Sequence, residues 1–172
     1  IGDEGYDVGH TIVWEDTGGL ASGGVVCSDG EKAEGFSGAS ASPTTLWVDY
    51  VAHEIGHQFN AEHNFVSEEC ETSVDGFRYE PGEGSSIMSY ADVCGGDAQY
   101  ANASDPYFHY SSIAQIQSFI ATVSCGTRES TGNSSAPVSN AQGDITIPKS
   151  TPFVLVGSAT DANDAASQLT YG

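Results

Sequence analysis

Residues 53–63 read HEIGHQFNAEH, and this stretch decides how the rest of the chain is interpreted. His53 and His57 are four positions apart, so on a helix their side chains lie on one face and can reach a single metal ion. Glu54 follows the first histidine, where a carboxylate can take a proton from metal-bound water. The stretch therefore predicts a helix that carries two metal ligands and a general base.

His63 follows His57 by six positions and can join the pair only if the helix ends and the chain turns back. Asn60 stands at the expected turn, and Asn is second only to Gly in adopting the left-handed conformation that ends a helix. Three neutral imidazoles and one carboxylate are typical of a catalytic zinc site, because structural sites are usually closed by four protein ligands. We therefore predict a catalytic Zn²⁺ site with His53, His57 and His63 as ligands and Glu54 as the base.

The same stretch, followed by SSIMSY at residues 85–90, resembles the metzincin zinc peptidases. Their signature is H-E-x-x-H-x-x-G-x-x-H followed by a methionine turn. Within that clan the chain is most similar to the reprolysin (adamalysin)-like group, in particular its bacterial secreted members, over roughly residues 1–125. Asn60 stands where these families usually have Gly, and Tyr90, two residues after Met88, is more typical of astacins and serralysins.

This resemblance implies an α+β metzincin catalytic domain with a mixed twisted sheet, an active-site helix and a C-terminal helix. The implied activity is that of a zinc-dependent endopeptidase, in which Glu54 assists the attack of zinc-bound water on peptide bonds. Met88 would lie under the histidines as an apolar floor. Tyr90 would act as an extra zinc ligand, as a stabiliser of the tetrahedral oxyanion, or only as a structural residue.

The resemblance also implies how protein or peptide substrates bind to what we expect to be a monomer. It places residues 19–24 beside the active-site helix, where an extended peptide can add as an antiparallel strand. The expected substrate-binding residues are Gly19, Leu20, Ala21, Ser22 and Gly23. Residues 91–93 would wall the pocket for the side chain after the scissile bond, and the preference of that pocket stays open.

Two other functions compete with the endopeptidase hypothesis. One is an adhesin or binding module whose peptidase-like domain is inactive, although an inactive relative would have no need of Glu54. The other is a different kind of zinc hydrolase, including one in which Glu80 replaces His63 as the third ligand.

Composition limits the partners of the chain. Its 172 residues include 24 acidic and only four basic side chains, for a formal net charge of −20. Such a chain is repelled by nucleic acid and by anionic lipid surfaces, and no apolar run reaches the roughly 18 residues of a membrane helix. An ordinary solvated acidic surface explains the charge better than adaptation to salt. Calcium is a second candidate cation on resemblance and composition alone, because no EF-hand spacing occurs.

Four cysteines allow three disulfide pairings. The predicted zinc site uses only histidines, so all four thiols are available for disulfides. The resemblance implies the pairs Cys27–Cys125 and Cys70–Cys94. Disulfides would place the protein in an oxidising, extracellular environment as a secreted enzyme, and the alternative is a cytosolic protein with reduced thiols.

The elements of the first domain follow from the residue pattern. We expect strands at residues 8–14 and 20–26 and a helix from about residue 45 to residue 59. Ser112 and Gln115 resemble a capping box, which predicts a further helix that ends near Cys125.

Composition changes after Cys125, which predicts a second domain. Residues 126–140 are rich in Ser, Thr, Asn and Gly and are typical of a linker. Residues 141–172 resemble the first strands of an immunoglobulin-like or cadherin-like sandwich, with strands expected at 144–148 and 152–157. A sandwich needs roughly 100 residues, so we expect a truncated module here. We likewise expect residues 1–125 to be the C-terminal part of a catalytic domain whose first elements precede Ile1.

Overall fold

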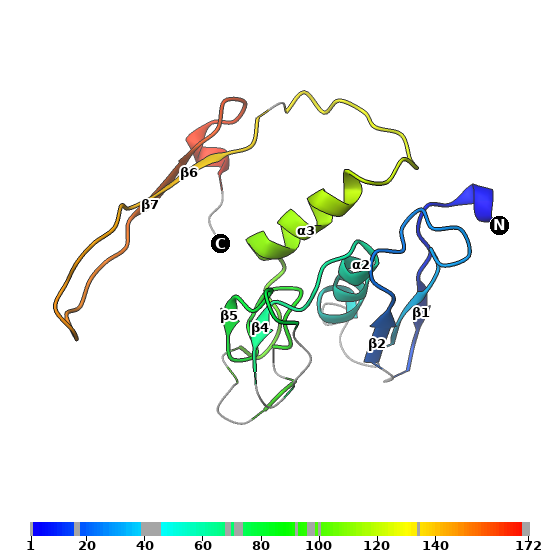
Figure 1. The fold of residues 1–172 in the computed structure, drawn as a ribbon, viewed down its shortest axis with the longest axis horizontal. Helices are drawn as coiled ribbons and strands as arrows, with labels where there is room; N and C mark the ends of the chain where they lie inside the picture. Colours follow the sequence, from blue (N-terminus) through cyan, green and yellow to red (C-terminus); the bar gives the residue numbers. More distant parts are fainter. Residues whose placement is uncertain are drawn as a thin grey trace. The chain divides into compact units, whose positions relative to one another are not determined.

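A computed structural model describes residues 2–15, 18–38, 46–67, 70, 74–91, 93–95, 99, 101–133 and 135–169. The chain forms two compact units, Ile1–Gly126 and Thr127–Gly172. The first unit combines short helices with small sheets (Figure 1), in agreement with the expected α+β class. No helix of the described part is long and apolar enough to cross a membrane.

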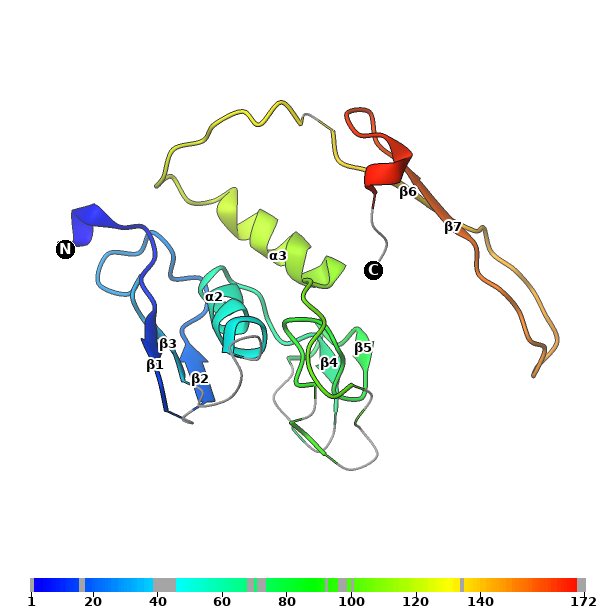
Figure 2. The same ribbon diagram turned by 180° about the vertical axis from the view of Figure 1, so that it is seen from behind.

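A three-stranded mixed sheet follows a short 3₁₀ turn at Asp3–Gly5. Its strands are β1 (Thr11–Val13), β2 (Gly18–Ala21) and β3 (Gly35–Gly38), in the order β1-β3-β2. Strand β3 is parallel to β1 and antiparallel to β2. Strand β2 therefore lies at an edge of the described sheet, next to the helix α2 described below (Figure 2).

The strand predictions were only partly correct. Strand β1 is shorter than residues 8–14, and β2 ends at Ala21 rather than continuing to residue 26. The chain leaves the sheet there because the amides of Gly24 and Val25 donate to the carbonyls of His57 and Gln58, each at 3.0 Å. The valines after Gly24 are thus buried in a turn against a helix end. Strand β3 was not predicted.

The active-site helix begins with a wider, π-helical segment, η2 (Leu46–Ala52), and continues as the α-helix α2 (His53–Gln58). The prediction of a helix over residues 45–59 agrees with this span, although Thr45 lies outside the described residues. π-Helical geometry is rare and is frequent at functional sites. Val51 is buried on the inner face, and Ile55 packs against it.

The core beneath α2 is built around Met88, which is fully buried. A side chain at Gly56 would collide with Met88 and would contact Phe108 at 3.1 Å, so only glycine lets the helix approach this closely. The packed apolar residues of this cluster are Ala61, Ile87, Met88, Val48, Ala52, Phe108 and Ile116.

Two very short parallel strands, β4 (Phe65–Val66) and β5 (Glu80–Pro81), precede the loop that contains Met88. Helix α3 (Tyr110–Ile120) then packs its Ile116 on the core. The predicted capping box was wrong, because His109 is the N-cap and its Nδ1 accepts from the Ser111 amide at 3.2 Å. The side chain of Gln115 instead accepts a bond from the amide of Glu62.

The second unit contains the antiparallel hairpin of β6 (Val138–Ala141) and β7 (Gly157–Thr160), followed by a 3₁₀ turn at Ala166–Gln168. The strands predicted at 144–148 and 152–157 were therefore misplaced, and β6 begins inside the expected linker. An alternating pattern of apolar and polar residues fixes the register of a strand only where one face of that strand is buried. Here Phe153 and Val154 are 57% and 76% exposed, so burial does not hold this apolar run in register.

Candidate active site

Three histidines converge at one point of the first unit. The Nε2 atom of His63 lies 3.0 Å from that of His53 and 3.1 Å from that of His57. One ligating atom from each residue falls within 4.8 Å of the other two. The described residues include no second such group of histidine, cysteine and acidic side chains.

The end of α2 explains how His63 reaches the other two. Asn60 has a φ of 69°, in the left-handed region. The amide of Asn60 donates to the carbonyl of His57 at 2.7 Å, and the amide of Ala61 donates to that of Gly56 at 2.9 Å. This pair of bonds is the Schellman motif, which ends a helix and reverses the chain. The turn predicted from Asn60 is thus what returns His63 to the helix.

Backbone carbonyls fix the tautomers of the two helical histidines. The Nδ1–H of His53 donates to the carbonyl of Ile87, and the Nδ1–H of His57 donates to the carbonyl of Ala61, both at 2.7 Å. Because a carbonyl only accepts, each Nδ1 carries the proton and each Nε2 presents a lone pair. Both lone pairs belong to the nitrogens that face His63.

This donor set fits a zinc ion. A neutral His63 has at most one Nε2 proton, which cannot make two good hydrogen bonds to the lone pairs of His53 and His57. A cation among the three nitrogens would satisfy all of them. Zinc–nitrogen bonds of about 2.0–2.1 Å in a tetrahedron separate neighbouring ligand atoms by roughly 3.3 Å. The observed 3.0 and 3.1 Å are close to that spacing.

The electrostatics of the cluster keep the imidazoles neutral. Burial, together with the neighbouring His57 and His63, holds the pKa of His53 well below its usual value. Burial and then His63 lower the pKa of His57 to about 4. Metal binding requires deprotonated ligands, so these two side chains are in the required form at neutral pH.

Glu54 lies beside the cluster at the edge strand. Its side chain is buried, and burial raises the pKa of its carboxyl group to about 7. A side chain at Gly19 of β2 would collide with the Glu54 carboxylate, so glycine leaves the room in which that group lies. A carboxyl group poised near neutral pH suits proton transfer in both directions.

The methionine turn contacts the histidines at Ile87 and at Tyr90, on either side of Met88. The carbonyl before Met88 holds His53, as described above, while Met88 itself packs under Gly56. The ring of Tyr90 lies edge-on to His63 at a centroid distance of 4.6 Å and at 5.6 Å from His53. Tyr90 therefore borders the histidine cluster.

A cleft of about 300 Å³ runs along β2 past the histidines. Four of the five expected substrate-binding residues line it: Gly19, Leu20, Ala21 and Gly23. Ser22 does not, and its hydroxyl donates to Glu34 at 2.8 Å. Glu80, the alternative third ligand, accepts bonds from the hydroxyl of Ser86 at 2.5 Å and from nearby amides rather than joining the histidines.

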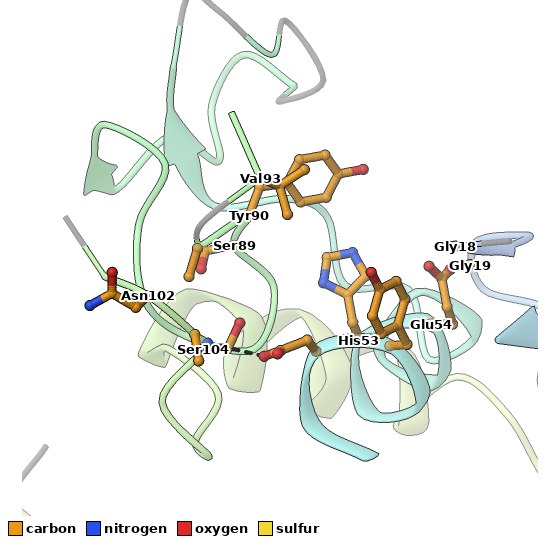
Figure 3. Close-up of a pocket in the computed structure, with 13 residues that line it drawn as sticks. Gly18, Gly19, His53, Glu54, Ser89, Tyr90, Val93, Asn102 and Ser104 are labelled. Carbon is orange, nitrogen blue, oxygen red and sulfur yellow. Dashed lines mark hydrogen bonds between the residues drawn. The ribbon is translucent and has the colours of Figure 1, made fainter. Parts of the chain in front are cut away.

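A second cavity, of about 450 Å³, is lined by His53 and Glu54 among others (Figure 3). Ala91 and Val93, expected at this pocket, line it, and Asp92 lies outside the described residues. The sequence analysis missed the polar residues of this pocket, Asp49, Asn102 and Ser104. Asp49 could have been identified, because it precedes His53 by four positions and therefore shares its face of the helix.

Two disulfides join Cys27 to Cys125 and Cys70 to Cys94, the pairs that the resemblance implies. The first connects the turn after β2 to the segment after α3. The second closes the loop that carries Met88, with a sequence separation of 24 residues. Both brace chain segments that contribute to the candidate site.

Comparison with known proteins agrees with this geometry. The family model described as metallo-peptidase family M12B, reprolysin-like, matches residues 1–119. No curated protein matches the chain. The match covers the histidine cluster, Glu54 and the methionine turn, and it confirms the resemblance to the reprolysin-like group. The chain belongs to the reprolysin-like metallopeptidases of family M12B.

Proposed function

We propose that this protein is a secreted zinc-dependent endopeptidase with Glu54 as its general base. The observation that carries the proposal is the convergence of three imidazole nitrogens beside a buried carboxyl group whose pKa is raised to about 7. A closed structural site would need a fourth protein ligand, and the described residues place no fourth histidine, cysteine or acidic side chain with the three histidines.

The residues of the chain have distinct parts in the proposed reaction. His53, His57 and His63 hold the metal through Nε2. When bound, Zn²⁺ polarises the scissile carbonyl and lowers the pKa of water towards about 7. Glu54 accepts the proton of the attacking water and later delivers it to the leaving amine. Tyr90 borders the same space and is proposed to stabilise the tetrahedral oxyanion or to act as an extra ligand.

Substrate binding is proposed to use the free edge of β2. The strand lies at the edge of the described sheet, and its Leu20 is 68% exposed. An extended peptide can add to such an edge as an antiparallel strand, with main-chain hydrogen bonds for affinity and side-chain pockets for specificity. The cleft along β2 would then carry the scissile bond past His57 and Glu54.

The setting of the enzyme is also a proposal. Two disulfides favour an oxidising, extracellular environment. We propose residues 1–125 as catalytic, and residues 141–172, together with β6 from Val138 onward, as part of a separate β module. A monomer is the simplest assembly for an edge-strand cleft that must remain open to substrate.

Hydrolysis of a quenched protein substrate, with and without a chelator, tests the proposal. We expect the chelator to abolish hydrolysis and added Zn²⁺ to restore it. Glu54→Gln should bind zinc and lose several orders of magnitude in kcat, since it removes the base. Glu4→Gln, which changes an exposed carboxylate of the first turn, is the matched control and should retain activity. Equal rates for Glu54→Gln and the wild type would refute the role of Glu54.

A further inference from the structure

The cavity beside His53 and Glu54 has an acidic side chain in its wall. It has a volume of about 450 Å³, within the range of about 300–1,000 Å³ typical of ligand pockets. Asp49 lies four residues before His53, and both residues line this cavity.

The carboxylate of Asp49 is held in place by the loop opposite. Its Oδ1 accepts a hydrogen bond from the amide of Ser104 at 3.0 Å, drawn in Figure 3 as a dashed line. Oδ2 has no hydrogen-bond partner among the described residues. A carboxylate that is held by one oxygen can accept a hydrogen bond through the other. A guanidinium or ammonium group of a substrate side chain is a suitable donor.

No positive charge of the described part of the first unit competes for this position. Its basic residues, Lys32 and Arg78, do not line the cavity. Lys32 pairs with Asp29 at 2.6 Å and Arg78 pairs with Asp75 at 3.4 Å. An apolar side chain in the pocket would remove water from Asp49 without replacing its hydrogen bonds, which is unfavourable.

We propose that Asp49 determines specificity, by selecting substrates with arginine or lysine at the residue that follows the scissile bond. This inference rests on the proposed function, because it assigns a side-chain preference to the same site. Asn102 and Ser104 add polar groups to the pocket wall, while Val93 offers an apolar surface for the stem of a long basic side chain.

Two quenched peptides that differ only after the scissile bond, with arginine or its uncharged isostere citrulline, test the inference. For the full chain loaded with zinc, we expect kcat/KM to favour arginine by about 10- to 100-fold, the range of a charge-assisted hydrogen bond. In Asp49→Asn the ratio should fall to near one, since asparagine keeps an acceptor for Ser104 but loses the charge. Glu4→Gln should retain the wild-type ratio.

Two further measurements keep the inference testable if Asp49→Asn does not fold. The arginine preference of the wild type should weaken as ionic strength rises, because partly exposed charges are screened. In a Glu54→Gln background, zinc-loaded protein should bind the arginine peptide more tightly than the citrulline peptide by a similar factor. A third peptide, with the arginine moved three positions further from the scissile bond, should lose the advantage if the preference belongs to this pocket.

The outcomes separate the two proposals. Chelator-sensitive cleavage with equal rates for arginine and citrulline would overturn the role of Asp49 and leave the peptidase intact. An arginine preference that persists in folded Asp49→Asn would also overturn it. No cleavage of any peptide by zinc-loaded protein would refute the proposed function, and the binding comparison would still test the pocket.

Discussion

Burial shifts the pKa of Glu54 in the opposite direction to the pKa values of His53 and His57. Burial raises the pKa of the Glu54 carboxyl group to about 7 and lowers that of His57 to about 4. In the zinc-free protein between pH 4.5 and 6.5, Glu54 therefore takes up a proton on folding, while the imidazole of His57 releases one. The two pKa shifts therefore change the unfolding free energy of the zinc-free protein in opposite directions as pH rises.

Comparison of zinc-free wild type with zinc-free Glu54→Gln isolates the contribution of the carboxyl group. Its pKa rises from 4.5 to about 7 on folding, so its stabilising contribution is present below pH 4.5 and is lost as pH rises through 7. The unfolding free energy of the wild type, minus that of the variant, should fall by on the order of 3 kcal/mol across this window. Urea titrations at several pH values measure this, and parallel pH profiles would contradict it.

A substitution at Tyr90 can distinguish a catalytic role of its hydroxyl from a structural role of its ring. Tyr90→Phe keeps the ring that packs against His63 and removes only the hydroxyl. If the hydroxyl stabilises the oxyanion, kcat should fall by about 10²–10³-fold, while KM and zinc content stay near wild type. Unchanged kcat in a zinc-loaded variant would assign Tyr90 a structural role.

At the scale of the element, the end of α2 controls the metal site. Asn60 adopts the left-handed conformation at the position where the chain reverses. Asn60→Ala should be less stable than Asn60→Gly by about 1–2 kcal/mol, the cost of this conformation for a residue with a Cβ and no polar side chain to offset it, and should bind zinc more weakly. Asn60→Gly, which has no Cβ, is the matched control and should bind zinc like the wild type. Urea unfolding and zinc titration measure the pair, and an alanine variant as stable as the glycine variant would contradict the argument.

A buried side-chain network joins the same helix to the sheet. Gln58 is fully buried, accepts from Nδ1 of His10 at 2.9 Å and donates to the carbonyl of Gly9 at 2.8 Å. Nε2 of His10 then accepts from the hydroxyl of Ser37 at 2.8 Å. The network ties α2 to β3 and to the residues before β1, so it holds the edge strand β2 of the same sheet in register with the metal ligands.

Gln58→Leu should lower the unfolding free energy by on the order of 2–3 kcal/mol, because it removes the hydrogen-bond partners that Gln58 supplies to Nδ1 of His10 and to the carbonyl of Gly9. Gln117→Leu, an exposed position of α3, is the matched control and should cost little. Thermal and urea unfolding give the comparison. Equal stability of the two variants would show that the network is not needed to hold the helix on the sheet.

How much the sequence could predict differs between elements for a physical reason. The ligand spacing of His53 and His57 follows from local helical geometry, and Asn60 gave the position of the turn. Strand β3 and the pairing in the second unit depend on partners distant in sequence, which local alternation does not specify. The spacing of Asp49 four positions before His53 indicates a shared helix face, but it does not indicate a role for the carboxylate until the contact with Ser104 is known.

At the scale of the whole molecule, the two disulfides enclose loops of very different length. Cys27 and Cys125 are 98 residues apart, whereas Cys70 and Cys94 are 24 apart. Loop-closure entropy grows with the logarithm of loop length, so opening the first should cost about 1 kcal/mol more than opening the second. Calorimetry of the two double serine variants compares them. A larger loss on opening the Cys70–Cys94 loop would mean that strain or residual structure outweighs chain entropy.

The whole account depends on three imidazoles that hold one zinc ion. Zinc K-edge X-ray absorption of the full chain, prepared with one equivalent of metal, tests this most directly. We predict a first shell of three imidazole nitrogens at about 2.0–2.1 Å with one further light atom, and one fewer imidazole in His63→Ala. A shell with fewer than three imidazoles in the wild type, or an unchanged shell in His63→Ala, would contradict the account.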